Sequence, residues 1–211
     1  NVDSRVRFTI AMDTSVPGPR FGEISFATND TDEQVYRFLV SGNVQGNFAV
    51  GSPLIDIGER TAAYQWLQTP QLIAGDALVF DSDSQSFNNG ELEVEIVANA
   101  TAADRLGIRN VGASGGEIGV LGNSVTYSGV PMGTYSGGAG LTPLTVQFND
   151  QATIAAVQAL LQNLTYSNTA ADPGGASKHV AMRLTDDSGK VGNVANQQIA
   201  LGPSNLNQLP I

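Results

Sequence analysis

The chain contains no cysteine and only one histidine in its 211 residues. The lack of cysteine excludes disulfide bonds and thiolate metal sites, and with them the small domains that depend on disulfides. The single histidine, His179, has no metal-ligating neighbour in the sequence and gives no indication of a zinc site. No apolar run approaches the roughly 18 residues that indicate a membrane-spanning helix, so we expect no membrane insertion.

Basic residues are also scarce. Ten lysines and arginines against twenty aspartates and glutamates give a formal net charge of −10. A field of this sign repels polyanions, which argues against nucleic acid as a partner and favours cations. The lack of cysteine favours an extracellular or cell-surface bacterial protein, because a secreted eukaryotic module of this type would often carry a disulfide.

Short β-type segments separated by turns make up most of the chain, which contains 24 glycines and nine prolines. Residues 6–12, 22–28 and 34–44 are expected to be strands, and residues 90–97 alternate between polar and apolar side chains. In that last segment the glutamates at 91, 93 and 95 share the solvent face of one strand. The pattern predicts an all-β fold built from sandwiches.

One segment has a helical period instead. Residues 153–164 carry apolar side chains at 154, 157, 161 and 164, while the glutamines at 151, 158 and 162 fall outside that stripe. We therefore predict one short helix that covers the open end of a sandwich. Asn149 or Asp150 is the expected N-terminal cap.

The N-terminal part resembles a known family. The segment GEISFATND at 22–30, the acidic turn after it and YRFLVSGNV at 36–44 resemble the closing half of a choice-of-anchor D module, which is an immunoglobulin-like sandwich. The resemblance covers about Asn1 to Val44. It implies that residues 1–44 are the C-terminal strands of a partial sandwich, whose apolar face some other segment or chain must cover.

From about Gly51 to Gly202 the chain resembles the cadherin-like repeats that occur in tandem in large bacterial adhesins and matrix proteins. The resemblance rests on four segments: 81–84 (DSDS), 102–108 (AADRLGI), 155–169 (AAVQALLQNLTYSNT) and 184–187 (LTDD). It implies a complete cadherin-like sandwich over residues 45–202, with the helix inserted in it. Residues 203–211 would then be a linker, because 207–211 resemble the opening at 52–56, and the chain would be a piece of a tandem array.

Acidic residues crowd between Asp76 and Asp104, where no lysine, arginine or histidine occurs. A calcium ion takes six to eight oxygen ligands, and an Asp-x-Asp turn supplies two carboxylates from one loop. We predict that calcium is the candidate ion and that neighbouring loops complete its site; the alternative is a solvated acidic turn that begins a hairpin. The expected ligands are Asp81, Asp83, Asp104, Asp186 and Asp187.

No catalytic arrangement is expected. Residues 112–116 (GASGG) match the G-x-S-x-G nucleophile elbow around Ser114, but that elbow needs a helix after the serine and residues 117–121 have the pattern of a strand. His179 begins a strand segment and is expected to be an ordinary surface or edge residue. The sequence therefore predicts a chain that is not an enzyme.

The predicted function is that of a structural or adhesive module, a spacer or fibre-building unit whose partners are neighbouring modules of its parent chain or other copies in a fibre. One alternative is a carbohydrate-binding accessory module of a secreted hydrolase, in which Tyr64 and Trp66 would stack on sugar rings. Another is a fibre subunit that polymerises by strand complementation.

Overall fold

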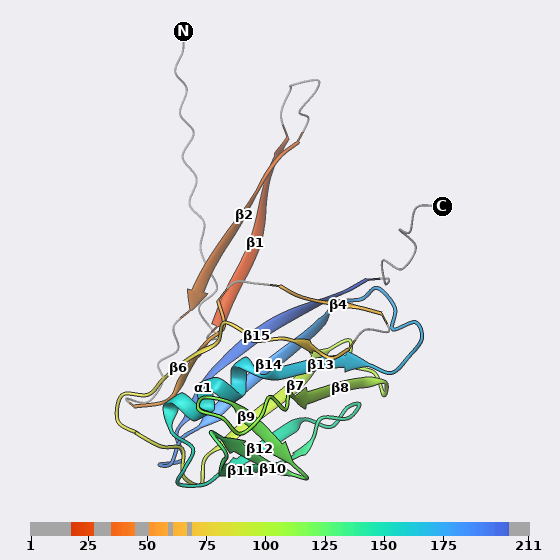
Figure 1. Ribbon diagram of the computed structural model, residues 1–211. Helices are drawn as coiled ribbons and strands as arrows, with labels where there is room; N and C mark the ends of the chain where they lie inside the picture. The colour runs from red at the N-terminus through yellow and green to blue at the C-terminus, as the bar shows by residue number, and fades with distance from the viewer. Residues whose placement is uncertain (1–17, 28–34, 45–50, 59–60, 67–68, 203–211) are drawn as a thin grey trace. The chain divides into compact units, whose positions relative to one another are not determined.

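The computed structural model describes residues 18–27, 35–44, 51–58, 61–66 and 69–202 of the chain (Figure 1). The chain divides into two compact units, residues 1–47 and residues 48–211. Within the described residues the elements are strands apart from one short helix, which confirms the prediction of an all-β fold. The immunoglobulin-like and cadherin-like identities remain predictions.

The first unit contains an antiparallel pair of strands, β1 (Gly18–Ala27) and β2 (Val35–Val44). Both fall where the sequence predicted strands. The predicted strand over residues 6–12 lies outside the described residues, and so do the side chains that would form the apolar face of this unit.

The second unit is built on an eight-stranded sheet with the order β4-β15-β14-β7-β12-β11-β10-β9. All neighbours in this sheet are antiparallel except β15 and β4, which are parallel. The strands are β4 (Ala62–Gln65), β15 (Val191–Gly202), β14 (Lys178–Thr185), β7 (Glu91–Ala98), β12 (Leu144–Phe148), β11 (Val130–Gly137), β10 (Ser124–Tyr127) and β9 (Ile118–Leu121).

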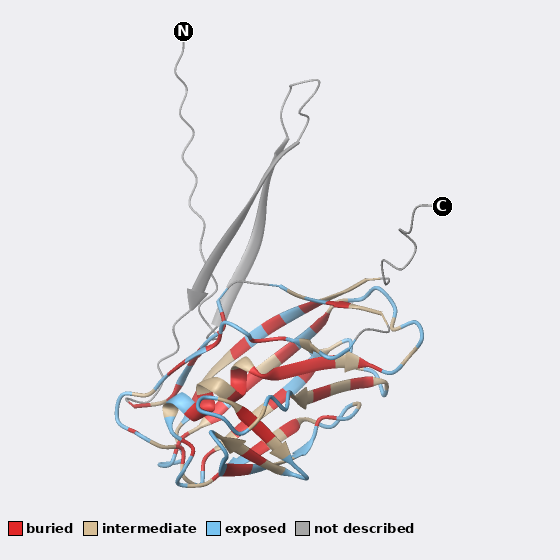
Figure 2. Ribbon diagram, in the orientation of Figure 1, coloured by how far each residue is buried: buried red, intermediate tan, exposed pale blue. Residues whose placement is uncertain are grey.

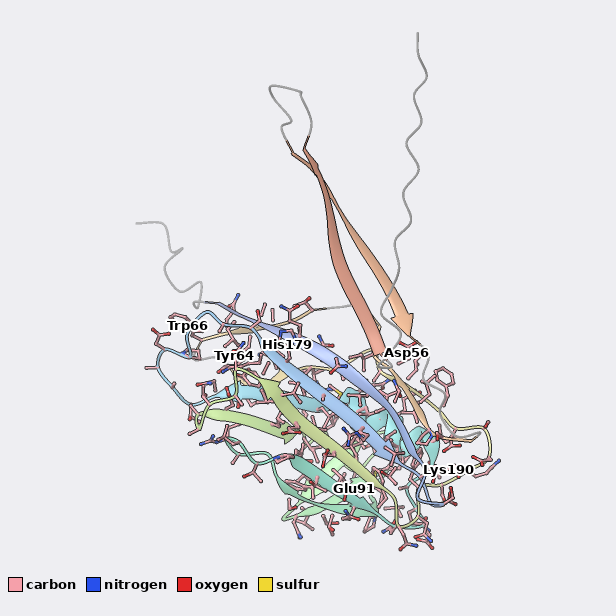
Figure 3. All side chains as sticks on the ribbon, turned by 180° about the vertical axis from the view of Figure 1, so that it is seen from behind. Asp56, Tyr64, Trp66, Glu91, His179 and Lys190 are labelled. Atoms are coloured by element: carbon pink, nitrogen blue, oxygen red, sulfur yellow. The ribbon has the colours of Figure 1, made fainter. Side chains whose placement is uncertain are left out.

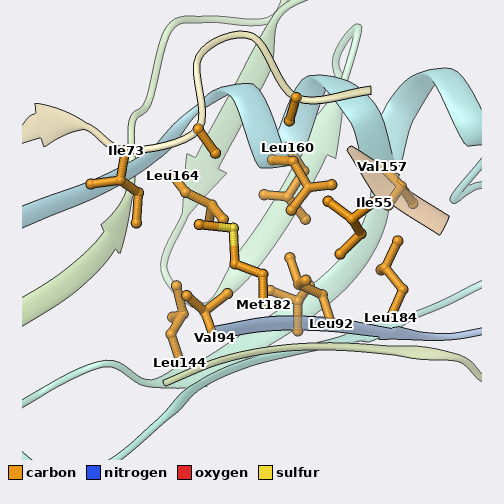
Figure 4. Close-up of a cluster of buried hydrophobic side chains, with 14 of the residues drawn as sticks. Ile55, Ile73, Leu92, Val94, Leu144, Val157, Leu160, Leu164, Met182 and Leu184 are labelled. Carbon is orange, nitrogen blue, oxygen red and sulfur yellow. The ribbon is translucent and has the colours of Figure 1, made fainter. Parts of the chain in front are cut away.

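Smaller elements form a second layer. A three-stranded sheet has the order β5-β13-β8, and β3 pairs with β6. These strands are β5 (Gln71–Leu72), β13 (Leu164–Asn168), β8 (Asp104–Ile108), β3 (Leu54–Asp56) and β6 (Leu78–Phe80). Figure 4 shows Val157 and Leu160 of the helix on the opposite side of the core from Met182 and Leu184 of the large sheet.

The helix α1 (Ile154–Gln162) begins at a cap that the sequence analysis missed. Thr153 is the N-cap, and its hydroxyl accepts a hydrogen bond from the backbone N–H of Ala156 at 3.3 Å. The prediction of Asn149 or Asp150 as the cap was therefore wrong. The side chain of Asn149 accepts from the backbone N–H of Gln151 instead, in a turn that precedes the helix.

Two glutamines of α1 that were predicted to lie outside its apolar stripe hold the helix against the chain near β6. Gln158 accepts a hydrogen bond from the backbone N–H of Val79 at 3.2 Å, and Gln162 donates one to the carbonyl of Ala77 at 2.9 Å. The opposite face of the helix is buried in the core. The helix is thus a part of the second layer, fixed by both polar and apolar contacts.

The core follows the alternation of the long strands (Figure 2). In β7 the apolar side chains at 92, 94 and 96 are buried, and the glutamates at 91, 93 and 95 lie on the other, more exposed face, as predicted. Gly90 allows β7 to approach β14 closely, because a Cβ atom there would lie 2.2 Å from the carbonyl oxygen of Thr185. This contact fixes the end of β14, where the turn that begins at Asp186 follows.

Candidate metal site

Three loops of the second unit meet at one end of the large sheet. They are residues 51–53 before β3, residues 81–84 after β6 and the turn 186–190 between β14 and β15. The side chain of Ser84 donates a hydrogen bond to Asp187 at 2.5 Å, and Lys190 Nζ lies 2.6 Å from Asp83 Oδ2. Figure 3 shows Lys190 at this end of the sheet and Trp66 toward the other end.

These loops bring together three carboxylates that could hold a metal ion. One oxygen from each of Asp81, Asp83 and Asp186 lies within 4.8 Å of the other two. The sequence predicted all three as ligands, from two acidic turns that are about a hundred residues apart in the chain.

Asp186 is fixed by the turn that it begins, and it is only 1% exposed. Its Oδ1 accepts hydrogen bonds from the backbone N–H of Ser188, the hydroxyl of Ser188 and the backbone N–H of Lys190, each at 2.8 Å. Its Oδ2 is buried and has no hydrogen-bond partner. One oxygen therefore sets the orientation of the carboxylate, and the other is free to bind a ligand.

The two oxygens of Asp81 differ from each other in the same way as those of Asp186. Its Oδ1 accepts hydrogen bonds from the backbone N–H groups of Asp83 and Ser84, both at 3.3 Å, and its Oδ2 is buried without a partner. Burial raises the pKa of Asp81 above its ordinary value, although these two amide groups act in the opposite direction. A buried carboxylate oxygen without a donor is costly unless a cation compensates it.

Asp83 is the exposed member of the cluster and already has a cationic partner. The hydrogen bond from Lys190 lowers the pKa of Asp83, and the same bond raises the pKa of Lys190. Asp187, which was also predicted as a ligand, is exposed and accepts the hydrogen bond from Ser84. It joins two of the loops and is not one of the three clustered carboxylates.

The loop at residues 51–53 packs directly against this cluster. Gly51 has a φ of +83°, and a Cβ atom there would lie 2.0 Å from Asp83 Oδ2; a Cβ atom on Gly192 would lie 2.1 Å from the carbonyl oxygen of Pro53. In the same loop, the hydroxyl of Ser52 is buried and has no hydrogen-bond partner.

The unpartnered buried oxygens concentrate at this end of the unit. In the part of the chain that the structure describes, four buried side-chain polar atoms have no partner, and three of them belong to Ser52, Asp81 and Asp186. Native proteins leave few buried polar groups unsatisfied, and a cation bound by the clustered carboxylates would satisfy the oxygens of Asp81 and Asp186. All three atoms are oxygens, which are the ligands that hard cations prefer.

Asp104 does not belong to this cluster. It is completely buried at the start of β8, and its Oδ1 accepts hydrogen bonds from the hydroxyl of Tyr166 at 2.6 Å and the amide of Asn168 at 2.7 Å. Its Oδ2 accepts from the backbone N–H of Thr101 at 2.6 Å and lies 3.2 Å from Lys178 Nζ. Burial raises the pKa of Asp104, but these hydrogen bonds together hold it below its ordinary value.

The distance along β14 explains why Asp104 cannot join the other ligands. Its partner Lys178 is the first residue of β14, and Asp186 directly follows the last. At about 3.3 Å per residue, eight residues separate the two ends of the strand by about 26 Å. The prediction placed Asp104 at the wrong end of the sandwich.

Two residues of this site were missed in the sequence. Lys190 lies four residues after Asp186 at the end of the same turn, and the spacing of a short hairpin turn places such a residue beside Asp186. Ser52 gave no comparable signal, because its neighbour Gly51 approaches Asp83 through a contact between loops that are about 30 residues apart in the chain.

The aromatic pair at residues 64 and 66 does not form an exposed binding platform. Tyr64 is buried, and its hydroxyl donates to the carbonyl of Asn168 at 3.2 Å. Trp66 is half-buried, and its backbone N–H donates to the carbonyl of Gly202 at 3.0 Å. The arrangement on which the carbohydrate-binding alternative depended is therefore not present.

Ser114 lies in a turn, not in a nucleophile elbow. Its carbonyl accepts a hydrogen bond from the backbone N–H of Glu117, and the strand β9 begins at Ile118. The helix that an elbow requires does not follow. His179 is an exposed residue of β14, as predicted.

Comparison with known proteins finds no family model, no curated protein and no solved structure that matches this chain. Among the described residues no helix is long and apolar enough to cross a membrane.

Proposed function

We propose that this chain is a structural module of a bacterial cell-surface or secreted repeat protein, a spacer or fibre-building unit without catalytic activity, and that its second unit binds a calcium ion. The ion would be held by Asp81, Asp83 and Asp186. The observation that carries the proposal is the convergence of these carboxylates with two buried, unpartnered oxygens among them.

The donor set favours calcium over other common metals. Zinc sites in proteins use mainly histidine and cysteine, whereas this cluster offers only oxygen. Magnesium requires nearly ideal octahedral geometry and releases its water reluctantly, whereas calcium accepts six to eight oxygens in flexible arrangements. Three carboxylates from two loops, with Asp83 partly in solvent, suit the less demanding ion, and water would complete its shell.

A calcium ion at this place would serve a spacer directly. It would tie together the loops 81–84 and 186–190, and Asp83 packs against Gly51 near the beginning of the second unit. A spacer must resist local opening at its ends, where loops have the fewest buried apolar contacts. Charge neutralisation at this end would oppose such opening.

The test is thermal unfolding in calcium chloride and in a chelator. Binding only to the folded state stabilises it by RT ln(1 + [L]/Kd), which is about 2.7 kcal/mol at a hundredfold excess over Kd. For a domain of this size that stabilisation corresponds to a rise in Tm of roughly 5–10 °C.

Asp186→Asn should remove the calcium effect, because it takes away one of the buried charges. Asp172→Asn is the matched control, since Asp172 is exposed and lies in the loop before Lys178, at the other end of β14. Equal melting temperatures in calcium and in chelator for the unaltered chain would show that the cluster is only an acidic turn. An equal response to magnesium would show that the ion is not selected.

A further inference from the structure

Lys190 is a basic side chain placed inside the acidic cluster. Its backbone N–H donates to Asp186 Oδ1 at 2.8 Å, and its carbonyl accepts from the backbone N–H of Asp186 at 3.0 Å. Its Nζ then reaches Asp83 Oδ2 at 2.6 Å. The same residue is therefore fixed to one candidate ligand through its backbone and neutralises another through its side chain.

We propose that Lys190 is a tethered competitor of the metal ion: its ammonium group occupies Asp83 in the metal-free unit and leaves Asp83 when a divalent cation binds. This inference rests on the proposed cation site and concerns its regulation. A cation bound to Asp83, Asp81 and Asp186 would lie within about 4 Å of an ammonium group that stayed on Asp83, and charges of the same sign repel strongly at that separation.

The exposure of the pair makes this exchange feasible. The side chain of Lys190 is 30% exposed and that of Asp83 is 47% exposed, so both groups can return to water when they separate. Exposed ion pairs are weak, and a lysine keeps its charged group hydrated on a flexible stem. Asp81 and Asp186 need not rearrange. Their Oδ1 atoms accept the hydrogen bonds of the turns, and their Oδ2 atoms have no partner and can bind the ion.

Lys190 also explains why repulsion among the three carboxylates does not disrupt the metal-free unit. Three carboxylates within 4.8 Å of one another repel, and the ammonium group of Lys190 removes a part of that repulsion. The cost is a lower affinity for the ion, because part of the binding free energy is spent on displacing Lys190. The site would therefore respond to calcium at a higher concentration than its ligands alone would require.

The first test is the calcium affinity of variants, measured by isothermal titration with calcium chloride. Lys190→Met should lower Kd about tenfold or more, which corresponds to about 1.4 kcal/mol. Arg183→Met is the matched control, because Arg183 is an exposed cation of β14 whose partner is Glu93 and not the cluster. Its removal should change Kd less than about threefold, since salt screens charges that lie beyond about 8–10 Å.

The second test uses the two lysines of the chain as reporters. Lys178 is 2% exposed, so an amine-acetylating reagent should modify Lys190 and leave Lys178 as an internal reference. Calcium chloride should increase the rate at which Lys190 is acetylated, because displacement from Asp83 frees its amine. Peptide mass spectrometry would measure both lysines in one sample.

The proposal requires both results. If Lys190→Met binds calcium no more tightly than Arg183→Met, or if calcium leaves the acetylation of Lys190 unchanged or slows it, then Lys190 is not a competitor, although the calcium site stands. If neither the unaltered chain nor Lys190→Met binds calcium, both this inference and the proposed cation site are wrong. Calcium binding by Lys190→Met alone would show that the ion does not displace Lys190 in the unaltered chain, and it would contradict the proposed exchange.

Discussion

Two pairs of aspartate and lysine lie at opposite ends of β14. They contain the same two residue types but differ in burial and in the distance between the charged groups. Asp104 and Lys178 are buried and 3.2 Å apart, whereas Asp83 and Lys190 are partly exposed and 2.6 Å apart. The shorter contact is thus the one that water can replace. Distance alone does not tell which pair holds the fold together.

The difference lies in how the carboxylate oxygens are used. Both oxygens of Asp104 accept hydrogen bonds, from groups on three segments of the chain, so this carboxylate has no capacity left for a ligand. In the cluster at the other end, Asp81 and Asp186 each keep one buried oxygen without a donor. A buried carboxylate whose two oxygens both have hydrogen-bond partners indicates a structural role, and one with an unpartnered oxygen indicates a binding site.

The largest effect that would test this comparison is the loss of one partner of the buried pair. Lys178→Met leaves the charge of Asp104 buried without its cation, and breaking a buried pair in this way costs about 3–5 kcal/mol. Urea unfolding in the presence of chelator would measure it. Lys190→Met, the matched change at the exposed pair, should alter metal-free stability little; equal losses would show that the two pairs have the same role.

The pH dependence of stability should follow the buried pair as well. The pKa of Asp104 is held below its ordinary value of 3.8, so its contribution is fully present above that pH and is lost as the pH falls through the lowered pKa. A double variant, Asp104→Asn with Lys178→Met, removes this ionisation without leaving an unpaired charge. Its stability should decline less steeply below about pH 3.8 than that of the unaltered chain, and parallel declines would contradict the assignment.

The sequence predicted those features that depend on local patterns. Alternation identified the buried and exposed faces of β7, and the helical spacing identified α1 within two residues of its end. The acidic turns at 81–84 and 186–187 were identified because an Asp-x-Asp spacing and a hairpin turn are both visible within a few residues. These patterns need no knowledge of which strands are neighbours.

The errors concern contacts between distant parts of the chain. Asp104 has the same residue type and a similar turn context as Asp81, and only the strand order shows that it lies at the other end of β14. The cap of α1 was misplaced because Asn149, Asp150 and Thr153 are all good capping residues. The choice of Thr153 depends on where the backbone becomes helical, and the bridge between Ser86 and Thr153 fixes the chain at that point.

The smallest expected effect concerns Ser52, and its sign should depend on the ion. The buried hydroxyl of Ser52 has no partner, so Ser52→Ala removes an unsatisfied polar group and should leave metal-free stability unchanged or raise it by up to about 1 kcal/mol. If the hydroxyl of Ser52 is a further oxygen ligand beside the three carboxylates, the same variant in saturating calcium should lose about 1 kcal/mol of the stabilisation that the ion provides. Unfolding in urea, with calcium and with chelator, would measure both changes.

Ser84→Ala is the matched control for this prediction, because the hydroxyl of Ser84 already donates to Asp187. Its removal leaves a loop contact unmade with and without the ion, so it should destabilise both forms by a similar amount. A stability change of opposite sign with and without calcium for Ser52→Ala, and of the same sign for Ser84→Ala, would show that the ion uses the hydroxyl of Ser52 and not that of Ser84. If Ser52→Ala also destabilises both forms equally, its hydroxyl has an ordinary structural role, and the cation site consists of the three carboxylates and water.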